Sequence, residues 1–578
     1  MVAAIDFESY YAKGCDIGSL GAYHYLRHPK VDAYLVSIVC DDFEWVGHPK
    51  DFDWHRLDGS FLVAHNLAWD GLVLAHLIER GDVPPIKIAG SACTANLAAY
   101  LGAPRNLAGT AKQLLGMDVS KDLRAWMKGK TWEDTVAAGR AEELRQYALR
   151  DSQACFEIWQ RYSGHWPAHE QKLAQMTMFS GWRGFKVDAE RVADGIRTLD
   201  RVLFDAEAKI PWADSDAAVL SPKALGEACR AVGIKPPPSL SEDDPECEAW
   251  ERIHGGRYPW VGAMRDYRKA NALREKLKTM QARTRESDGC MAYGLKYFGG
   301  HTGRWSGDAG YNIQNLPRGE SYGVDLRSCI VPRPGFEFVV CDLSQIEPRV
   351  LAWLCGDQAL LDQLATGVPL YEAHARMTMG WRGGNLKKEN PRIYSLAKAR
   401  VLGLGYGCGP DKFVAVARIM GGIEITAAEA AKVVTEFRQS NRRTTALWNR
   451  LQTEFRRSAN GDYEIELLSG RRLTYRNVSS RGGWTAQTER GGPRQYIYGG
   501  RLAENLTQAT ARDVFAEALL RLAAAGVDVV FHVHDEAICE VPVGTGPHEI
   551  ERLMSITPDW LPGCPIAAEA AVANRYCK

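Results

Sequence analysis

Two acidic residues interrupt an apolar segment near the end of the chain, FHVHDEAICEV at residues 531–541. Apolar residues alternate on both sides of Asp535 and Glu536, which predicts two strands joined by a tight turn. A hairpin this apolar must pack against a core, so its tip carries charge to the edge of that core. One carboxylate holds a metal ion poorly, and Asp535 therefore needs a second acid supplied by the fold.

The segment VVCDLSQIEPR, residues 339–349, offers that second acid. It begins as a strand and becomes helical after Asp342. Pro348 falls early in this helix, where its missing backbone donor is tolerated. Asp342 therefore stands at the end of an expected strand.

The bulk properties set only wide limits. A chain of 578 residues suggests two to four domains. Hydrophobic residues make up 46% and charged residues 25%, which indicates a globular protein. The 71 basic residues balance the 71 acidic ones, so net charge neither indicates nor excludes a polyanionic partner.

The cysteines and the apolar segments bear on the compartment. The 14 cysteines include no CxxC pair and no zinc-finger spacing, which favours a reducing cytosol. The amino-terminal MVAAIDFES is not a signal peptide, and no apolar run reaches about 18 residues. We expect a cytoplasmic protein without a membrane partner.

Four acids lie in the first 165 residues, where strand-like and helical runs alternate in an α/β pattern. Asp6 and Glu8 share one face of an expected strand, and Tyr147 and Asp151 share one face of an expected helix. Asp70 follows an asparagine by four residues. Each pair alone is usually a surface feature. In one cleft the four acids would repel, so they make sense together only with bound cations.

The order D-x-E, N-x3-D and Y-x3-D resembles the proofreading 3′→5′ exonuclease domain of family A DNA polymerases. The resemblance covers residues 1–165 and implies a ribonuclease H-like fold. It implies two Mg²⁺ ions about 4 Å apart, replaceable by Mn²⁺, that activate water and stabilise the leaving oxygen. Tyr147 would orient that water. The metal ligands would be Asp6, Glu8, Asp70 and Asp151.

The two later motifs resemble palm motifs of the same family. The resemblance implies that Asp342 and Asp535 hold a second pair of Mg²⁺ ions. One ion would activate the primer 3′-hydroxyl and the other would hold the triphosphate. Glu536 would support the site, His534 would lie near the primer terminus, and Gln345 would contact the nucleotide.

The segment SLAKARVLGLGYGCG places Lys398, Leu402 and Tyr406 four residues apart, which on a helix is one stripe. It resembles the O-helix motif of the family. Lys398 would bind the triphosphate and protonate the pyrophosphate, and Tyr406 would pack near the templating base. Glu347 would crowd the sugar 2′ position and so select deoxyribonucleotides.

Two positions depart from the family pattern. Tyr394 stands where many relatives carry an arginine for the γ-phosphate. Arg392, Arg400 and the basic segment 385–392 are the candidates to replace it. Leu402 stands where many relatives have an aromatic ring, which leaves the rejection of dideoxynucleotides open.

Further segments predict contacts with DNA. HTGRWSGDAGYNIQNLPR resembles the family segment in which Arg304 contacts the primer end, with Gln314 and Asn315 along the minor groove. Gln508, in RLAENLTQATARD, would reach the same groove. The helical segment 265–286 holds eight basic and three acidic residues, and is either a solvated helix or one that follows a phosphate backbone.

The expected fold class is α/β plus α+β, in several domains. We expect a monomer that acts on primer–template DNA and deoxyribonucleoside triphosphates. The wording of the motifs resembles phage-encoded members, which would act in the bacterial host cytoplasm; processivity and replisome factors are unknown. The expected parts are a 3′→5′ exonuclease domain (1–165) and a right-hand polymerase domain (166–578), with thumb about 190–295, palm about 296–350 and 505–578, and fingers about 351–500.

Two other functions stay open. The first is an exonuclease or DNA-binding protein whose polymerase half is inactive, and the motif residues Asp342, Lys398 and Asp535 argue against it. The second is a single-subunit RNA polymerase, against which Glu347 and the front acids argue.

Overall fold

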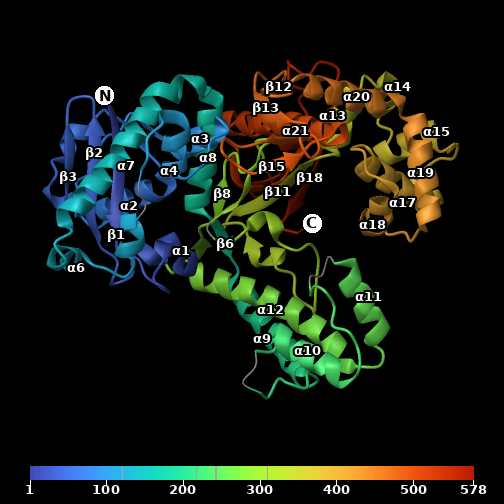
Figure 1. Ribbon diagram of the computed structural model, residues 1–578, viewed down its shortest axis with the longest axis horizontal. Helices are drawn as coiled ribbons and strands as arrows, with labels where there is room; N and C mark the ends of the chain where they lie inside the picture. Colours follow the sequence, from blue (N-terminus) through green and yellow to red (C-terminus); the bar gives the residue numbers. More distant parts are fainter. Residues whose placement is uncertain (120–121, 216–217, 241–243, 309, 578) are drawn as a thin grey trace.

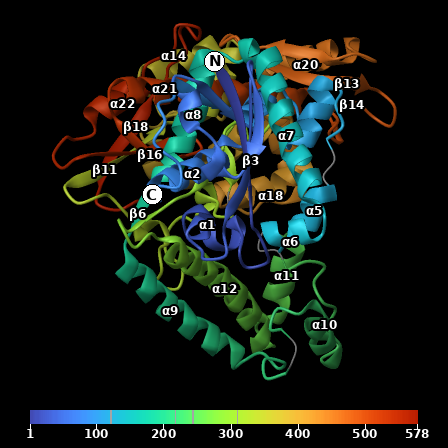
Figure 2. The ribbon, with the colours of Figure 1, turned by 90° about the vertical axis from the view of Figure 1, so that its left-hand side faces the viewer.

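The computed structural model describes residues 1–119, 122–215, 218–240, 244–308 and 310–577. The front of the chain forms an α/β unit on one side, and the later part forms a central sheet with helices around it (Figure 1). A helical hairpin extends away from the sheet (Figures 1 and 2). Within the described residues, no helix is both long and apolar enough to cross a membrane.

The front unit is built on a five-stranded sheet in the order β3-β2-β1-β4-β5. β1 pairs antiparallel with β2 and parallel with β4. Its side chains alternate between two buried faces: Ile5 and Phe7 pack with α2, and Ala4 packs with α7. Asp6 and Glu8 continue the face of Ala4, so they turn toward α7. The bounds are β1 (Val2–Ser9), β2 (Ala33–Cys40), β3 (Glu44–Gly47), β4 (Phe61–Ala64), β5 (Gly90–Cys93), α2 (Leu67–Glu79) and α7 (Ala141–Tyr162).

Shorter helices complete the front unit, and α8 leads from it to the central sheet. The predicted strands at the start of the chain and the predicted helix 141–162 are confirmed. The helices are α1 (Ile17–Leu26), α3 (Thr94–Tyr100), α4 (Leu107–Thr110), α5 (Asp122–Met127), α6 (Trp132–Ala137) and α8 (Ala168–Arg183).

The central sheet has the order β16-β17-β11-β18, and all its pairs are antiparallel. β11 is buried on both faces: Val339 and Cys341 pack toward α21, and Phe338 and Val340 pack toward the base of the helical hairpin. This double burial explains why the strand is almost continuously apolar. The predicted hairpin around Asp535 is confirmed. The bounds are β11 (Phe336–Leu343), β16 (Asp528–Val533), β17 (Glu536–Pro542), β18 (Ala568–Ala573), α21 (Gly499–Ala524) and α22 (His548–Met554).

The helical hairpin consists of α9 (Ala189–Glu207) against α12 (Pro259–Arg283), with α10 (Pro222–Ala231) and α11 (Pro245–His254) near its tip. The predicted helix at 265–286 is confirmed over 265–283. It begins earlier, with Pro259 as a favourable first residue, and ends at Arg283. Some of its basic residues are used internally: Arg274 pairs with Asp200 at 3.0 Å, and Arg283 donates to the Gly18 carbonyl.

Small strands connect the helical hairpin to the central sheet. β6, β7 and β10 form one sheet, and β8 pairs with β9. Their bounds are β6 (Phe185–Val187), β7 (Cys290–Met291), β8 (Gly294–Lys296), β9 (Ser306–Asp308) and β10 (Ile330–Val331).

A layer of helices follows β11 along the chain and stands on the far side from the front unit (Figure 1). The prediction of one helical stripe through Lys398, Leu402 and Tyr406 was wrong, because α17 gives way to a wider π turn, η7. A Cβ on Gly403 would lie 2.5 Å from Val416 of α18, so the backbone of this turn packs closely against that helix. The bounds are α13 (Ile346–Leu354), α14 (Gln358–Ala365), α15 (Leu370–Thr378), α16 (Leu386–Glu389), α17 (Pro391–Ala399), η7 (Arg400–Leu404), α18 (Pro410–Gly421), α19 (Ala427–Ser440) and α20 (Arg442–Arg457).

A second four-stranded antiparallel sheet, in the order β12-β13-β14-β15, packs against α20 and α21 through one shared core. Its far end reaches back to the front unit, where the Arg490 N–H donates to the Gly102 carbonyl at 2.8 Å. The bounds are β12 (Tyr463–Glu466), β13 (Arg472–Ser479), β14 (Thr485–Gln487) and β15 (Arg494–Tyr496).

Candidate active sites

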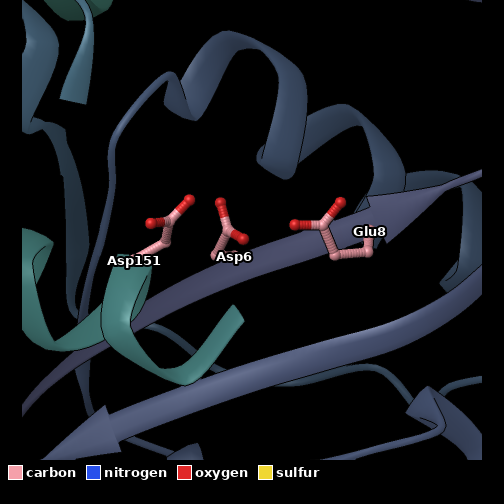
Figure 3. Close-up of side chains that lie close together, drawn as sticks. All are labelled: Asp6, Glu8 and Asp151. Atoms are coloured by element: carbon pink, nitrogen blue, oxygen red, sulfur yellow. The ribbon is translucent and has the colours of Figure 1, made fainter. Parts of the chain in front are cut away.

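The front acids converge from two elements. One carboxylate oxygen from each of Asp6, Glu8 and Asp151 lies within 4.8 Å of the other two. Figure 3 shows Asp6 and Glu8 rising from the same side of β1, with Asp151 reaching them from α7. The alternation of β1 therefore produces the cluster, since residues two apart on a strand share a face.

Asp70 and Tyr147 join this cluster from neighbouring elements. Asp70, on α2, is 2% exposed and accepts a hydrogen bond from the Phe7 N–H at 3.1 Å. Tyr147 lies one helical turn before Asp151 on α7 and is half-buried. The structure thus brings all five predicted front residues into one neighbourhood.

Burial and mutual repulsion raise the pKa values of the carboxyl groups in this cluster. Burial raises the pKa of Asp6 to about 6, against an opposing effect of Arg124. Burial and then Asp6 raise the pKa of Glu8 and of Asp70 well above the ordinary range. Burial, followed by Asp151, also raises the pKa of Tyr147. Arg124, on α5, was not identified from the sequence, because only the docking of α5 brings it near.

This donor set fits a divalent cation. Closely spaced carboxylate oxygens are the ligands that hard cations such as Mg²⁺ prefer. The raised pKa values express the cost of keeping several negative charges in a partly buried place, and a bound cation would remove that cost.

The second cluster forms where β11 ends beside the β16–β17 turn. The Leu343 N–H donates to the Asp535 carbonyl at 3.2 Å, and Asp342 pairs in register with Glu536. His534 has φ of +56°, in the left-handed region that a two-residue turn requires. The fold thus brings Asp342 and Asp535 together although they are far apart in the sequence.

The Asp535 carboxyl lies in a strongly charged environment. Burial, then the neighbouring Asp342, raises the pKa of Asp535 to about 7. Arg304 opposes that shift and also donates to Glu347. Burial raises the pKa of Glu347, and Arg304 acts in the opposite direction. Arg304, Gln314, His534 and Asp535 line one small cavity.

The other two acids at this edge of the sheet, Glu536 and Glu569, differ in burial and in hydrogen bonding. Glu536 is 3% exposed and accepts a hydrogen bond from the Tyr576 hydroxyl at 2.9 Å, which favours a supporting role. Glu569 pairs in register with Asp342 from β18, so both side chains stand on one face of the sheet. Glu569 was missed because its proximity depends on strand pairing alone.

Tyr406 approaches the same acids from the helical layer. A Cβ on Gly500 would lie 2.2 Å from the Tyr406 carbonyl, so only glycine permits this contact with α21. Burial raises the pKa of Tyr406, and Glu347 and Glu504 add to the effect. Gln508 donates to Glu504 at 3.4 Å. Glu504 was also missed, and it places Gln508 beside Tyr406.

The remaining predicted residues differ in exposure and in the elements that carry them. Lys398 and Leu402 are half-buried on α17 and η7. Gln345 caps the start of α13 with φ of +53°. Gln314 is 7% exposed, whereas the neighbouring Asn315 is exposed on the side of α12. The pair therefore does not present one continuous face.

The structure separates the candidates for the missing arginine at Tyr394. Arg400 is 2% exposed and lies against Phe437 and Glu436 of α19, the latter at 4.0 Å. Arg392 is exposed at the start of α17. The Lys387 ammonium lies 5.9 Å from the centre of the Tyr394 ring. Burial of Arg400 leaves Lys387, Lys388 and Arg392 as the accessible cations among these candidates.

Comparison with known proteins identifies the family to which the chain belongs. Residues 212–576 match the family model described as DNA polymerase family A. The chain belongs to DNA polymerase family A.

Individual relatives agree with this assignment. The DNA polymerase of Bacillus phage SP02 is 28% identical over 565 residues, which cover 84% of this chain and 85% of that protein. DNA polymerase I of Aquifex aeolicus is 26% identical over 298 residues, covering 50% of this chain and 48% of that protein. The POL domain of Pol1 from M. smegmatis, in complex with DNA primer-template and dNTP, has a similar fold. Its TM-score is 0.68 at 18% identity, with 99% of this chain and 95% of that chain covered.

Proposed function

We propose that this protein extends a DNA primer along a template with deoxyribonucleoside triphosphates, and removes misincorporated nucleotides from the 3′ end. The observation that carries the first activity is the meeting of Asp342 and Asp535 at the end of β11, in a chain that belongs to DNA polymerase family A. Arg304, Glu347 and Tyr406 surround that meeting point.

Asp342 and Asp535 would hold divalent ions, with Mg²⁺ the expected species and Mn²⁺ a substitute. Bound there, the ions would supply activation of the primer hydroxyl and neutralisation of phosphate charge. Arg304 holds the Glu347 carboxylate, and Glu347 in turn limits the space for a sugar 2′-hydroxyl. Lys398 would bind the triphosphate from the helical layer.

The second activity belongs to the front unit, residues 1–165. Its support is the cluster of Asp6, Glu8, Asp70 and Asp151 beside the five-stranded sheet of an α/β unit. These acids would hold a separate pair of divalent ions, and Tyr147 would orient the attacking water. We assign residues 166–578 to the polymerase part, with a role in copying a phage genome in the host cytoplasm.

Primer extension tests the first activity. A labelled primer annealed to a longer template is incubated with Mg²⁺ and all the deoxyribonucleoside triphosphates, and extension to the end of the template is expected. DNA binding without extension would favour a protein with an inactive polymerase half. Synthesis from a promoter with ribonucleotides alone and no primer would favour an RNA polymerase.

Loss of the front acids tests the second activity. The double variant Asp6→Ala, Glu8→Ala should stop degradation of a labelled single strand and leave primer extension intact. The reciprocal variant Asp535→Ala should stop extension and leave degradation. Degradation that persists in the double variant would contradict the assignment of strand degradation to the front cluster.

A further inference from the structure

A large cavity lies between the front unit and the β12–β15 sheet, apart from both carboxylate clusters. Its volume is about 640 Å³, within the range of ligand sites. One wall is the segment 99–105 that follows α3, and the other is formed by the loop 298–301 and by β13.

The lining is strongly cationic. The lining holds five cationic side chains and one carboxylate, that of Glu489. The cations are Arg105, Lys296, Arg471, Arg472 and Arg476. Arg471 is committed to a buried bond with Asp513 at 2.6 Å. Arg472, Arg476 and Lys296 have longer contacts with acids, at 3.3, 3.4 and 3.3 Å, of a kind that contributes little at a surface.

Two buried donor atoms at this place have no acceptor among the described residues. They are Nη2 of Arg105 and Nε of Arg490. Arg105 bonds Asn96 through its other terminal nitrogen at 2.9 Å, so its guanidinium is held in place while one donor stays unused. Arg490 acts electrostatically on Arg476, which places a further cation beside the lining. Buried donors without acceptors are costly, which suggests that a ligand supplies them.

The cavity is bridged by a strap that consists of β14, β15 and the tip 488–493 between them. The tip contacts the front unit through the Arg490 N–H and the Gly102 carbonyl, and Gly491 lies against the Gln113 amide. Internal hydrogen bonds stiffen the strap, among them Gln487 to the Gly492 carbonyl at 2.6 Å and Arg494 to the Thr485 carbonyl at 2.9 Å. A ligand in the cavity is therefore enclosed by chain from both parts of the protein.

We propose that this strapped cavity binds the phosphodiester backbone of an unpaired DNA strand. Cations without strong internal partners and an enclosed groove are what a negatively charged, flexible strand requires, since phosphate contacts are independent of sequence. The proposal rests on the proposed function, because that function supplies DNA as the substrate. The unpaired strand is either the 5′ extension of the template or the frayed 3′ end of the primer.

Binding measurements at several salt concentrations test the cavity. The probes are a blunt duplex, a duplex with a long unpaired 5′ template extension, and a duplex with an unpaired 3′ primer end. For Arg105→Gln and Arg490→Gln we expect several-fold weaker binding of one of the two unpaired probes. The slope of log K against log salt should fall by about one per lost contact. The control is Arg552→Gln, an exposed arginine on α22 that pairs with Glu549.

The identity of the affected probe assigns the strand, because loss on the 5′ extension marks the template and loss on the 3′ end marks the primer. Unchanged affinity and unchanged slope for both unpaired probes would overturn the proposal, and so would an equal loss on the blunt duplex. Primer extension by the unmodified protein is measured in parallel, so that failure of the proposed function is seen separately.

A second variant tests the strap as a whole and removes Arg490 together with the rest of the tip. Gln487 and Arg494 are paired in register, so the tip 488–493 can be replaced by an Asn-Gly turn that keeps the hairpin and removes its reach to Gly102. We expect faster dissociation from the affected unpaired probe and an unchanged rate from the blunt duplex. Equal dissociation rates with and without the tip would contradict the role of the strap.

Discussion

At the scale of single residues, carboxyl groups at both proposed metal sites have raised pKa values, so cation binding there would be coupled to the release of protons. Burial and Asp342 raise the pKa of Asp535 to about 7, so the metal-free protein holds a proton there below that pH. A cation requires the ionised carboxylate and must displace this proton.

The first prediction follows from that exchange. Apparent Mg²⁺ affinity at the polymerase site should rise about tenfold per pH unit below pH 7 and level off above it. Titration of Mg²⁺ into the DNA complex of the Asp6→Ala, Glu8→Ala variant would measure it, because the front acids no longer contribute. An affinity that does not change between about pH 6 and pH 8 would contradict the assignment.

A second prediction concerns Glu347, which Arg304 holds beside Asp535. Glu347→Ala should reduce the preference for deoxyribonucleotides over ribonucleotides, because space opens at the sugar 2′ position. The ratio of kcat/KM for the two nucleotides measures the effect. Glu549→Ala is a matched control, since that acid is exposed on α22 and pairs only with the exposed Arg552 among the ion pairs of the described residues. Equal sugar discrimination in Glu347→Ala and the unmodified protein would remove this role.

At the scale of elements, α16 and α17 present cations next to the position where many relatives have an arginine. Lys387 lies over the Tyr394 ring, whereas Arg400 is buried against α19. A third prediction is that Lys387→Ala raises the KM for nucleotide several-fold with a smaller effect on kcat, because it removes a triphosphate contact. Lys432→Ala is the control, since Lys432 is an exposed lysine on α19, outside the candidate segment 385–392. Similar KM values for both variants would favour Lys388 or Arg392.

The sequence predicted those elements that have strong local patterns. The strand before Asp342, the hairpin around Asp535 and the helix that carries Asp151 all appear with nearly the expected bounds. The π turn at η7 was not predicted, because it depends on the packing of Gly403 against Val416 rather than on the local periodicity.

Site residues without a local pattern were also missed. Arg124 and Glu504 come close to the acids only through tertiary docking, and Glu569 does so through strand register. The motif residues were found because they recur in fixed order, whereas residues that tune the charge around them carry no such signal. The roles assigned to the motif residues stay predictions.

At the scale of the whole molecule, a buried ion pair joins α8, the helix that follows the front unit, to the central helix α21. Arg512 of α21 donates to both oxygens of Glu170 on α8, and both side chains are almost completely buried. Against the effect of burial, the Arg512 guanidinium lowers the pKa of Glu170 to about 2. This contact anchors the helix that leads out of the front unit to the helix that packs on the central sheet.

The fourth prediction is that Glu170→Gln destabilises the protein by about 3–5 kcal/mol. Buried Arg512 loses the carboxylate that bonds two of its nitrogens and, among the acids of the described residues, keeps only Asp513, at 3.2 Å, which it shares with Arg471. The depressed pKa means that the stabilisation is present above about pH 4.5 and is lost as the pH falls toward 2. Chemical unfolding of the variant measures the loss. Glu157→Gln is the control, since its pair with Arg161 is exposed and should be worth about 0–1 kcal/mol. Equal losses in the two variants would contradict the prediction.

The central claim is that Asp342 and Asp535 act as one pair in DNA synthesis. The most direct measurement is single-turnover primer extension by Asp342→Asn and by Asp535→Asn at saturating Mg²⁺ and nucleotide, with DNA binding and strand degradation measured on the same samples. Each substitution alone should abolish extension while binding and degradation persist. Extension near the unmodified rate in either variant would contradict the claim.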